Sequence, residues 1–472
     1  MIIDLNEVNS DRFSENNFDF CIIGSGAAGI TLAMELAKQN YTIALCEGGG
    51  EEFSVNSQDV YIGKETGDPY LNLEASRLRY FGGSTNHWAG WCRPFSELDF
   101  NRNYLGEEFK WPISNQDLLP YLPKACDILE IKNEFEYKDS YSLPVRGVIT
   151  QFSPPVRFAK KFKKDLSNSD NITLFLNSNL IDISGNNRAI QSAVFISYSK
   201  NKLQVNAKKF IFAMGGIENS RFLLWFKEKY KDKYFDTTTP IGNYWMEHPH
   251  FTLGQAIVDY PIGKDRFYVL SDQLQIQKKI LGCGFRLDLQ PEGATEEMIK
   301  EVSCLAPKLG DKLISLAQKN LICGVRFRAA WEQAPHWTNR ITLTDSVDHI
   351  GIPRINLNWQ KKVLDRQTLV ESIKVFNHWL LERDFGRIQL QDWVMNNLDY
   401  PTNDELAGNH HMGGTRMSSS SKYGVVDKNC KVFGSDNLYV IGSSVFTTSG
   451  ANNPTLPVTQ LSLRLAEHLI TL

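Results

Sequence analysis

The sequence lacks two features that would direct the protein to a membrane or to nucleic acid. No window of the 472 residues comes near the ~20 consecutive apolar residues that a membrane-spanning helix needs. Positive charge is not in surplus either, because 51 Lys and Arg residues stand against 54 Asp and Glu residues and the formal net charge is −3. Since nucleic-acid phosphates are neutralised by a basic surface, we expect neither a membrane span nor nucleic-acid binding.

Cysteine patterns typical of a metal site or a disulfide framework are also missing. The eight cysteines are scattered, without a Cys-x-x-Cys pair or close Cys/His spacing, so we expect reduced thiols. His248 and His250 have no Cys or acidic residue at ligand spacing, and no metal is expected there. Residues 1–17 contain no apolar segment like that of a secretory signal, which predicts a cytoplasmic protein.

The composition is that of a folded protein. Hydrophobic residues make up 42% of the chain and charged residues 22%, as in ordinary globular proteins, and the length corresponds to roughly two to four domains. Strands and helices alternate near both ends, and the middle has a hairpin pattern over 340–359 and helical patterns over 295–320 and 364–381. We therefore predict an α/β fold with an α+β substrate region, in which a domain of residues 1–250 and 405–472 is interrupted by a mostly antiparallel sheet with helices over 251–404.

A strand, a glycine-rich turn and a helix stand near the start of the chain. Residues 18–23 read as a buried strand, residues 24–29 as a Gly-x-Gly-x-x-Gly turn and residues 30–39 as a helix, with a second strand over 41–46. This order is typical of the βαβ unit that binds dinucleotides.

Each glycine of the turn has a role in such a unit. Gly24 permits the tight turn, Gly26 lets the pyrophosphate approach the backbone, and Gly29 lets the helix lie close to the strand. Glu47, 23 residues after Gly24, stands where an acid binds the adenosine ribose hydroxyls. The motif alone does not separate NAD from FAD, but the glycines at 48–50 and the long excursion after them favour FAD. We expect cofactor contacts from Gly24, Gly26, Ala27, Ala28, Gly29 and Glu47.

Three further segments resemble the glucose-methanol-choline (GMC) oxidoreductases, FAD enzymes that oxidise alcohols. Residues 82–88 are similar to the family's glycine-rich flavin loop, residues 210–221 to its second cofactor-contacting element, and residues 409–417 with 439–454 to its C-terminal segments. The resemblance is to members such as pyranose oxidases and glucoside 3-dehydrogenases. It implies a Rossmann-like FAD-binding domain with a flavin loop at 77–95 and further cofactor contacts from Gly82, Gly83, Ser84, Asn86, His87, Trp88, Gly215, Gly442, Ser443, Asn453 and Pro454.

Two residues match the catalytic positions of that family. A catalytic His lies three residues before a Gly, and a second His or Asn lies just before a helix, commonly followed by Pro; the matching residues are His410 and Asn453. The resemblance implies that the neutral imidazole of His410 takes the hydroxyl proton of the substrate, while the Asn453 amide holds the oxygen. His411 is the alternative base if the alignment slips by one residue.

His87 and three tryptophans leave alternatives open. His87 has the spacing of the histidine that is covalently linked to the flavin in pyranose oxidases; otherwise it is a hydrogen-bonded loop residue. Trp88, Trp91 and Trp245 are candidates for a floor on which a sugar stacks, although large aromatic residues are more often core.

The leading functional hypothesis is an FAD-dependent oxidoreductase that oxidises a hydroxyl group of a small sugar, glycoside or polyol. Oxygen, a quinone or a redox protein would accept the electrons. The alternatives are an FAD reductase or monooxygenase reduced by NAD(P)H, a non-catalytic flavin-binding protein, and photochemical use of the flavin on a fatty acid. A second Gly-x-Gly-x-x-Gly turn is missing, which argues against the first alternative, and the pair His410 and Asn453 argues against the other two.

Overall fold

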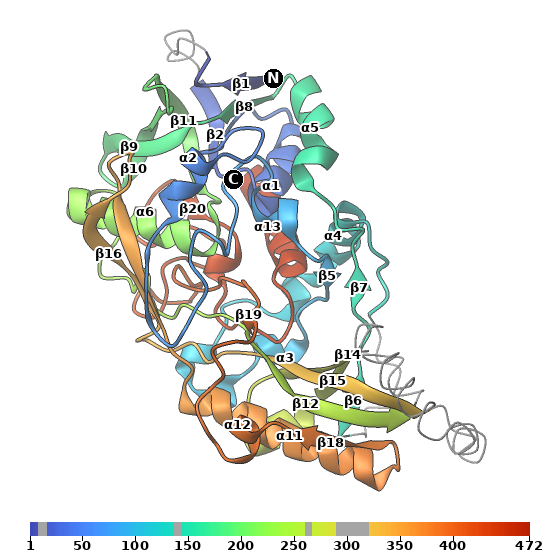
Figure 1. Ribbon diagram of the computed structural model, residues 1–472. Helices are drawn as coiled ribbons and strands as arrows, with labels where there is room; N and C mark the ends of the chain where they lie inside the picture. Colours follow the sequence, from blue (N-terminus) through green and yellow to red (C-terminus); the bar gives the residue numbers. More distant parts are fainter. Residues whose placement is uncertain (8–16, 136–143, 260–266, 289–320) are drawn as a thin grey trace.

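Two large sheets dominate the structure, a computed structural model. It describes residues 1–7, 17–135, 144–259, 267–288 and 321–472. The helix expected over 295–320 lies outside these residues. One sheet occupies the upper half of Figure 1 together with both ends of the chain, and the other occupies the lower half. No helix within the described ranges has the length and apolar character needed to cross a membrane.

The upper sheet has eight strands within the described residues. From one edge to the other they are β1 (Ile2–Asp4), β8 (Ile172–Leu176), β3 (Ile43–Cys46), β2 (Asn17–Ile23), β11 (Lys202–Phe212), β10 (Ala189–Ile196) and β9 (Asn179–Asn186), and β20 (Leu438–Val440) pairs with β11. The pairs from β1 to β11 and the pair of β11 with β20 are parallel, whereas β9, β10 and β11 pair antiparallel. The central strands are apolar runs, because helices cover both faces of such a sheet.

The first and last helices of this part of the fold lie side by side. Helix α1 (Ala27–Ala37) packs against α13 (Thr455–Ile470), as Figure 1 shows in blue and red. The α-helices between β3 and β12 are α2 (Val55–Gln58), α3 (Glu97–Phe100), α4 (Leu122–Leu129), α5 (Phe158–Asn168) and α6 (Gly215–Tyr230). The predicted βαβ unit is therefore confirmed.

Glycine is required where β2 turns into α1. Gly24 has a φ of +108°, which L side chains rarely adopt. A Cβ at Gly29 would lie 1.9 Å from the carbonyl oxygen of Gly24, so only glycine lets α1 begin this close to the strand.

The lower sheet is antiparallel throughout its described pairs. Its strands are, in order, β18 (Gly386–Leu390), β12 (Pro249–Asp259), β15 (Leu321–Trp331), β14 (Cys283–Asp288), β13 (Phe267–Leu270) and β6 (Val145–Gly147), and β19 (Leu406–Ala407) pairs with the start of β12. Helix α11 (Val363–Glu382) covers one face, where the rings of Phe285, Phe327 and Phe376 stack with centroids 4.8–5.5 Å apart. Because side chains alternate along a strand, the opposite face is the polar one.

Smaller elements connect the two regions. β16 (Arg340–Val347) and β17 (Pro353–Trp359) form the predicted hairpin, and β4 (Lys64–Gly67) adds to β17. β5 (Trp91–Cys92) pairs with β7 (Gln151–Phe152), and the short helices α8 (Asp272–Lys278) and α12 (Asp392–Met395) complete the lower region. The helix predicted over 364–381 is α11.

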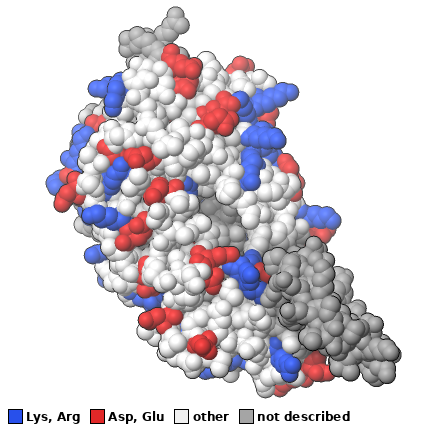
Figure 2. Space-filling view, in the orientation of Figure 1, with Lys and Arg blue, Asp and Glu red and all other residues white. Residues whose placement is uncertain are grey.

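Strands cross the domain boundaries predicted at residues 250 and 404. β4 and β6 come from the first 250 residues but pair with strands of the middle region, and β19 follows residue 404 but pairs with β12. The boundaries themselves stay a prediction. On the face drawn in Figure 2, acidic and basic side chains are interspersed rather than gathered by sign.

Candidate active site

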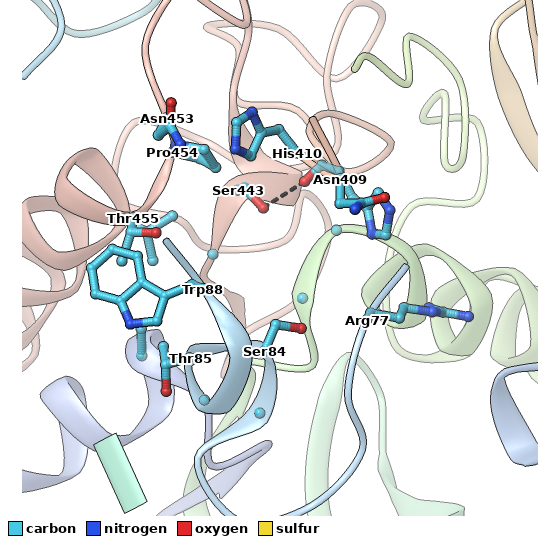
Figure 3. A pocket seen from close by; sticks show the side chains of 18 of the residues that line it. Arg77, Ser84, Thr85, Trp88, Asn409, His410, Ser443, Asn453, Pro454 and Thr455 are labelled. Atoms are coloured by element: carbon cyan, nitrogen blue, oxygen red, sulfur yellow. Dashed lines mark hydrogen bonds between the residues drawn. The ribbon is translucent and has the colours of Figure 1, made fainter. Parts of the chain in front are cut away.

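A cavity of about 670 Å³ is lined by residues from both large sheets. Its walls come from the turn before α1, the loop at 75–93, the segments 408–411 and 442–455, and the polar face of the lower sheet. Figure 3 shows part of it, with His410 and Asn453 at one end.

Most of the predicted site residues line this cavity. They are Gly24, Gly26, Ala27, Ala28, Glu47, Gly83, Ser84, His87, Trp88, Gly215, His410, Gly442, Ser443, Asn453 and Pro454.

Three predicted cofactor contacts lie behind the lining instead. Gly29 lets α1 pack on the glycine turn, and a Cβ at Gly82 would lie 2.9 Å from the backbone nitrogen of Ala159. The Asn86 side-chain amide donates to the carbonyl of Phe81 at 2.7 Å. These residues shape the backbone that carries the lining, and their direct contact with a cofactor stays a prediction.

The turn before α1 has the properties of an anion site. A Cβ at Gly26 would meet no described atom within 4 Å, so open space faces this backbone. As far as the described chain goes, α1 has no side-chain cap and no acidic residue in its first turn. Its first N–H groups and the positive end of its dipole therefore suit a diphosphate.

Glu47 follows β3 and is buried beside this turn. Its Oε2 accepts hydrogen bonds from the backbone nitrogen of Ser25 at 3.1 Å and the hydroxyl of Ser25 at 2.7 Å, and its Oε1 accepts one from the nitrogen of Gly49 at 3.0 Å. A carboxylate has about four acceptor positions, so capacity remains for a ribose hydroxyl. The turn, the helix start and Glu47 together fit the adenosine diphosphate half of FAD.

A second helix directs its N-terminus into the same cavity. α13 begins after Pro454, and within the described residues it has neither a capping side chain nor an acidic residue in its first turn. Asn453, Pro454 and Thr455 line the cavity and lie together in Figure 3. The side chain of Asn452 donates to the carbonyl of Pro94 at 2.9 Å, which holds the turn in place. This end of the cavity therefore also carries positive potential.

His410 contacts a second histidine that the sequence analysis did not assign to the site. The Nδ1 atoms of His410 and His248 lie 2.9 Å apart, although 162 positions separate the two residues. The contact forms because the segment before β12 runs antiparallel to the segment before Gly413, with Met246 bridged to Met412. Gly408 makes room for the ring, since a Cβ there would lie 2.6 Å from Nδ1 of His410.

The hydrogen-bond partners assign the tautomers of this pair. Nε2 of His248 lies 2.7 Å from the carbonyl oxygen of Gly450, and because a carbonyl only accepts, this nitrogen carries the hydrogen. Burial lowers the pKa of His248 to about 4, so the ring is neutral and its Nδ1 is an acceptor. His410 therefore donates from Nδ1, and its Nε2 is the nitrogen with a free lone pair. Burial and the neighbouring His248 hold the pKa of His410 well below its ordinary value of 6.5.

A buried carboxylate holds both histidine segments. Oε1 of Glu247 accepts from the backbone nitrogens of His248 at 2.8 Å and His410 at 2.7 Å, and Oε2 accepts from the hydroxyl of Tyr70 at 2.6 Å. Glu247 is fully buried, and this burial raises its pKa to about 7. The hydrogen bonds offset part of the cost of burying the charge.

His411 belongs to the same network but serves a different purpose. Because Tyr70 donates its hydrogen to Glu247, Nε2 of His411 donates to the Tyr70 oxygen across 3.0 Å. Burial lowers the pKa of His411 to about 3, and its ring lies 5.7 Å from that of Trp245. His411 also lines the cavity, but its Nε2 is engaged with Tyr70.

The three tryptophans do not form one floor. Trp88 and Trp91 line the cavity, whereas Trp245 is fully buried against Tyr70 and His411. Nothing in the described residues forms a cluster that could hold a metal ion.

Sequence reasoning missed His248, Glu247 and Tyr70 as parts of the site. From the sequence pattern, His248 and His250 are candidates only for a metal site. One signal for their presence in the site was the two-residue spacing of His248 and His250, because alternate residues of a strand lie on the same face. The residues that these two histidines contact depend on the pairing of β12 with β19.

The fold and the C-terminal region agree with known flavoprotein oxidoreductases. Residues 335–462 match the family model of the GMC oxidoreductases. The structure is similar to pyridoxine 4-oxidase from Mesorbium loti, with a TM-score of 0.63 at 14% identity over 96% of this chain and 99% of that one. It is also similar to formate oxidase of Aspergillus oryzae RIB40, with a TM-score of 0.59 at 16% identity over 97% and 98% of the two chains. The class that the fold and site define is an FAD-dependent oxidoreductase.

Curated relatives extend the match over the whole chain. The sequence is 22% identical to 2-methyl-1,2-propanediol dehydrogenase of Mycolicibacterium austroafricanum, over 97% of this chain and 96% of that protein. It is 23% identical to the large subunit of fructose dehydrogenase of Gluconobacter japonicus, over 60% of this chain and 50% of that subunit. The C-terminal part of the chain matches the GMC oxidoreductases, and the predictions of a GMC-type oxidoreductase, of an enzyme and of FAD as its cofactor are confirmed.

Substitutions of two glycines in the turn distinguish an effect on cofactor binding from an effect on folding. Gly26→Val adds a side chain that meets no described atom within 4 Å but fills the space of the diphosphate. We expect this variant to fold normally and to be purified with little FAD, as measured by absorbance after release of the flavin.

Gly29→Val is the matched control. Its Cβ would lie 1.9 Å from the Gly24 carbonyl oxygen. This variant should therefore lower the melting temperature of the protein even in the absence of FAD. A fully flavinated Gly26→Val protein would contradict the assigned diphosphate site.

Proposed function

We propose that the protein oxidises a CH–OH group of a small sugar, glycoside or polyol. The observation that carries this proposal is the pair of His410 and Asn453 at one end of the cavity, with the Nε2 lone pair of His410 left free by the contact of Nδ1 with His248. The names of the two curated relatives, a diol dehydrogenase and a fructose dehydrogenase, support the substrate class.

The side chains divide the reaction between them. Bound FAD supplies a two-electron acceptor for the hydride that leaves the carbinol carbon. Nε2 of His410 accepts the hydroxyl proton, and the carbon–oxygen bond becomes a carbonyl. The Asn453 amide donates a hydrogen bond to the reacting oxygen, and since Asn does not titrate near neutral pH, it positions the substrate without competing for the proton.

His248 keeps His410 in the productive tautomer. Its Nδ1 accepts the hydrogen of His410 Nδ1, and its own Nε2 is held by the Gly450 carbonyl. Without this acceptor, the His410 hydrogen could reside on either nitrogen, and the form with a free Nε2 would lose population.

A direct experiment tests the proposed reaction class. The holoenzyme is titrated anaerobically with sugars, glycosides, polyols and simple alcohols while bleaching of the flavin absorbance is recorded, and oxygen is then admitted. Bleaching by a hydroxyl compound supports the proposal. Bleaching by NADH or NADPH, with none by any hydroxyl compound, would identify a reductase instead.

His410→Ala should slow anaerobic flavin reduction by about 10²- to 10⁴-fold, the usual worth of a general base, with normal FAD content. Asn453→Ala should cost less, because one neutral hydrogen bond contributes about 0.5–1.5 kcal/mol. The measurement is rapid mixing with the best substrate of the panel.

His411→Ala is the control for His410→Ala. It removes a neighbouring buried imidazole whose partner is Tyr70 and should keep most of the rate, although its stability will fall. If His411→Ala abolishes flavin reduction and His410→Ala does not, the base is His411.

The pH profile of the same rate constant should be level around neutral pH. The base is active when neutral, and because the pKa of His410 lies well below 6.5, activity should be lost only as the pH falls into the range below that value.

His248→Asn retains an acceptor for the Nδ1 hydrogen of His410 and should keep most of the rate, whereas His248→Ala should lose up to about tenfold. A profile that falls at the ordinary histidine pKa, or equal rates for the two variants, would contradict the tautomer assignment.

His87 ends the 3₁₀ helix η3 (Gly83–His87) and is exposed toward the cavity. If it is linked to the flavin, acid precipitation should leave FAD with the protein, and His87→Ala should release it to the supernatant. His336→Ala, at an exposed histidine outside the cavity, is the control. Complete release of FAD from the unchanged protein would make His87 an ordinary loop residue.

A further inference from the structure

A second pair of side chains, His250 and Glu405, lies on the wall of the cavity beside the pair of His248 and His410. His248 and His250 are two residues apart on one face of the chain at the start of β12, and both line the cavity. A strand rises about 3.3 Å per residue, so the two positions lie about 7 Å apart. His250 is paired in register with Leu406, and this pairing brings it to the residue before Leu406, Glu405.

The second pair joins an imidazole to a carboxylate. Nδ1 of His250 lies 2.8 Å from Oε2 of Glu405, and Arg328 also forms an ion pair with that oxygen. Hydrogen bonds from His250 and Arg328 hold the pKa of Glu405 well below its ordinary value, so the carboxylate is ionised. Among the described residues, Nε2 of His250 has no hydrogen-bond partner, and Glu405 is about half exposed (49%).

An aromatic surface lies on the same side of the cavity. Trp91 and Phe267 line it with their ring centroids 5.2 Å apart, and the guanidinium of Arg286 lies 4.7 Å from the Trp91 ring centroid. Gly284 and Ala330 face each other across the β14–β15 register and line the wall, so their small side chains leave the space between these groups open.

Charge balance decides what kind of ligand this wall accepts. Arg286 donates from Nε to Asp288 at 2.6 Å, and Arg328 is paired with Glu405. Each of these guanidinium groups has a carboxylate beside it, so this part of the wall has little net charge to attract an anion. Hydroxyl groups suit it better, because the ionised carboxylate accepts hydrogen bonds from them. Since Nδ1 of His250 donates to Glu405, Nε2 of the neutral ring is also an acceptor for a hydroxyl group.

We propose that His250, Glu405 and Trp91 form the subsite that binds the non-reacting hydroxyls and one face of a neutral cyclic polyol or sugar, while His410 and Asn453 act on its reacting carbon. This inference rests on the proposed function and narrows it. Glu405 and His250 bind hydroxyls, and the Trp91 ring packs on the aliphatic face of the sugar. Simple alcohols would reach only the catalytic end.

Binding to the holoenzyme is measured first, by the rise of melting temperature that a ligand of the folded state produces. The ligands are D-glucose, D-fructose, myo-inositol, 1-butanol and gluconate. We expect one or more of the neutral polyols to raise the melting temperature, and neither 1-butanol nor gluconate to do so at the same concentration. A rise with gluconate alone, or with no neutral polyol, would overturn the proposal.

The variants are His250→Ala, Glu405→Gln and Trp91→Ala. His250→Ala and Glu405→Gln should weaken polyol binding about tenfold or more, as loss of a hydrogen bond to a charged group does. Trp91→Ala should weaken it as well, because it removes the ring that packs on the sugar. In anaerobic flavin reduction they should raise the apparent dissociation constant while the limiting rate changes only a few-fold, the opposite of His410→Ala. If Glu405→Gln loses FAD because Arg328 is left without its partner, His250→Ala and Trp91→Ala still decide the question.

The matched control is another His–Glu pair, on the surface of α11. Nε2 of His378 lies 3.0 Å from Oε1 of Glu382, and both residues are exposed. His378→Ala and Glu382→Gln should bind polyols like the unchanged protein. If the cavity variants behave like these controls while an alcohol still bleaches the flavin, the subsite is wrong and the proposed function stands. If polyols bind through His250 and Glu405 but no hydroxyl compound bleaches the flavin, the subsite stands and the proposed function fails.

Discussion

The buried carboxylate of Glu247 accepts hydrogen bonds from three segments of the chain: the start of β12, the loop that carries His410, and the loop of Tyr70. An ionised carboxylate without partners would be too costly at this depth, and burial already raises its pKa to about 7. The three hydrogen bonds stabilise the carboxylate and hold these segments together. This arrangement places the rings of His248 and His410 in contact, so the geometry of the proposed base depends on Glu247.

The electrostatic potential differs between the two ends of the cavity, because helix N-termini line one end and paired charges of the lower sheet line the other. The N-termini of α1 and α13, which lack capping side chains within the described chain, make the cofactor region favourable for negative charge. The lower sheet contributes Arg286 and Arg328, which are each paired with a carboxylate, so the wall proposed to bind the substrate is polar but balanced in charge. An anionic cofactor and the proposed neutral substrate would therefore not compete for the same charges.

The apolar and polar faces of the lower sheet have separate tasks. One face packs its phenylalanines under α11, which stabilises the sheet through burial of aromatic surface. The other face presents His250, Gly284 and Arg286 to the cavity. Because neighbouring residues of a strand point to opposite faces, substitutions in the wall can alter recognition with little effect on the core beneath it.

Features that depend only on neighbouring residues could be predicted from the sequence. The glycine turn and Glu47 could be found because turns and helix starts depend on neighbouring residues. His410 and Asn453 could be found because the short motifs around them resemble those of a known family, and Gly24, Gly26, Glu47, His410 and Asn453 all line the cavity. The same local reasoning could not tell that Gly29 and Asn86 support the lining from behind. The contacts of His248 with His410 and of His250 with Glu405 were decided only by the tertiary structure, since they join positions more than 150 residues apart through the register of β12 with β19. Strand register is set by packing of the whole sheet, and no short stretch of sequence contains that information.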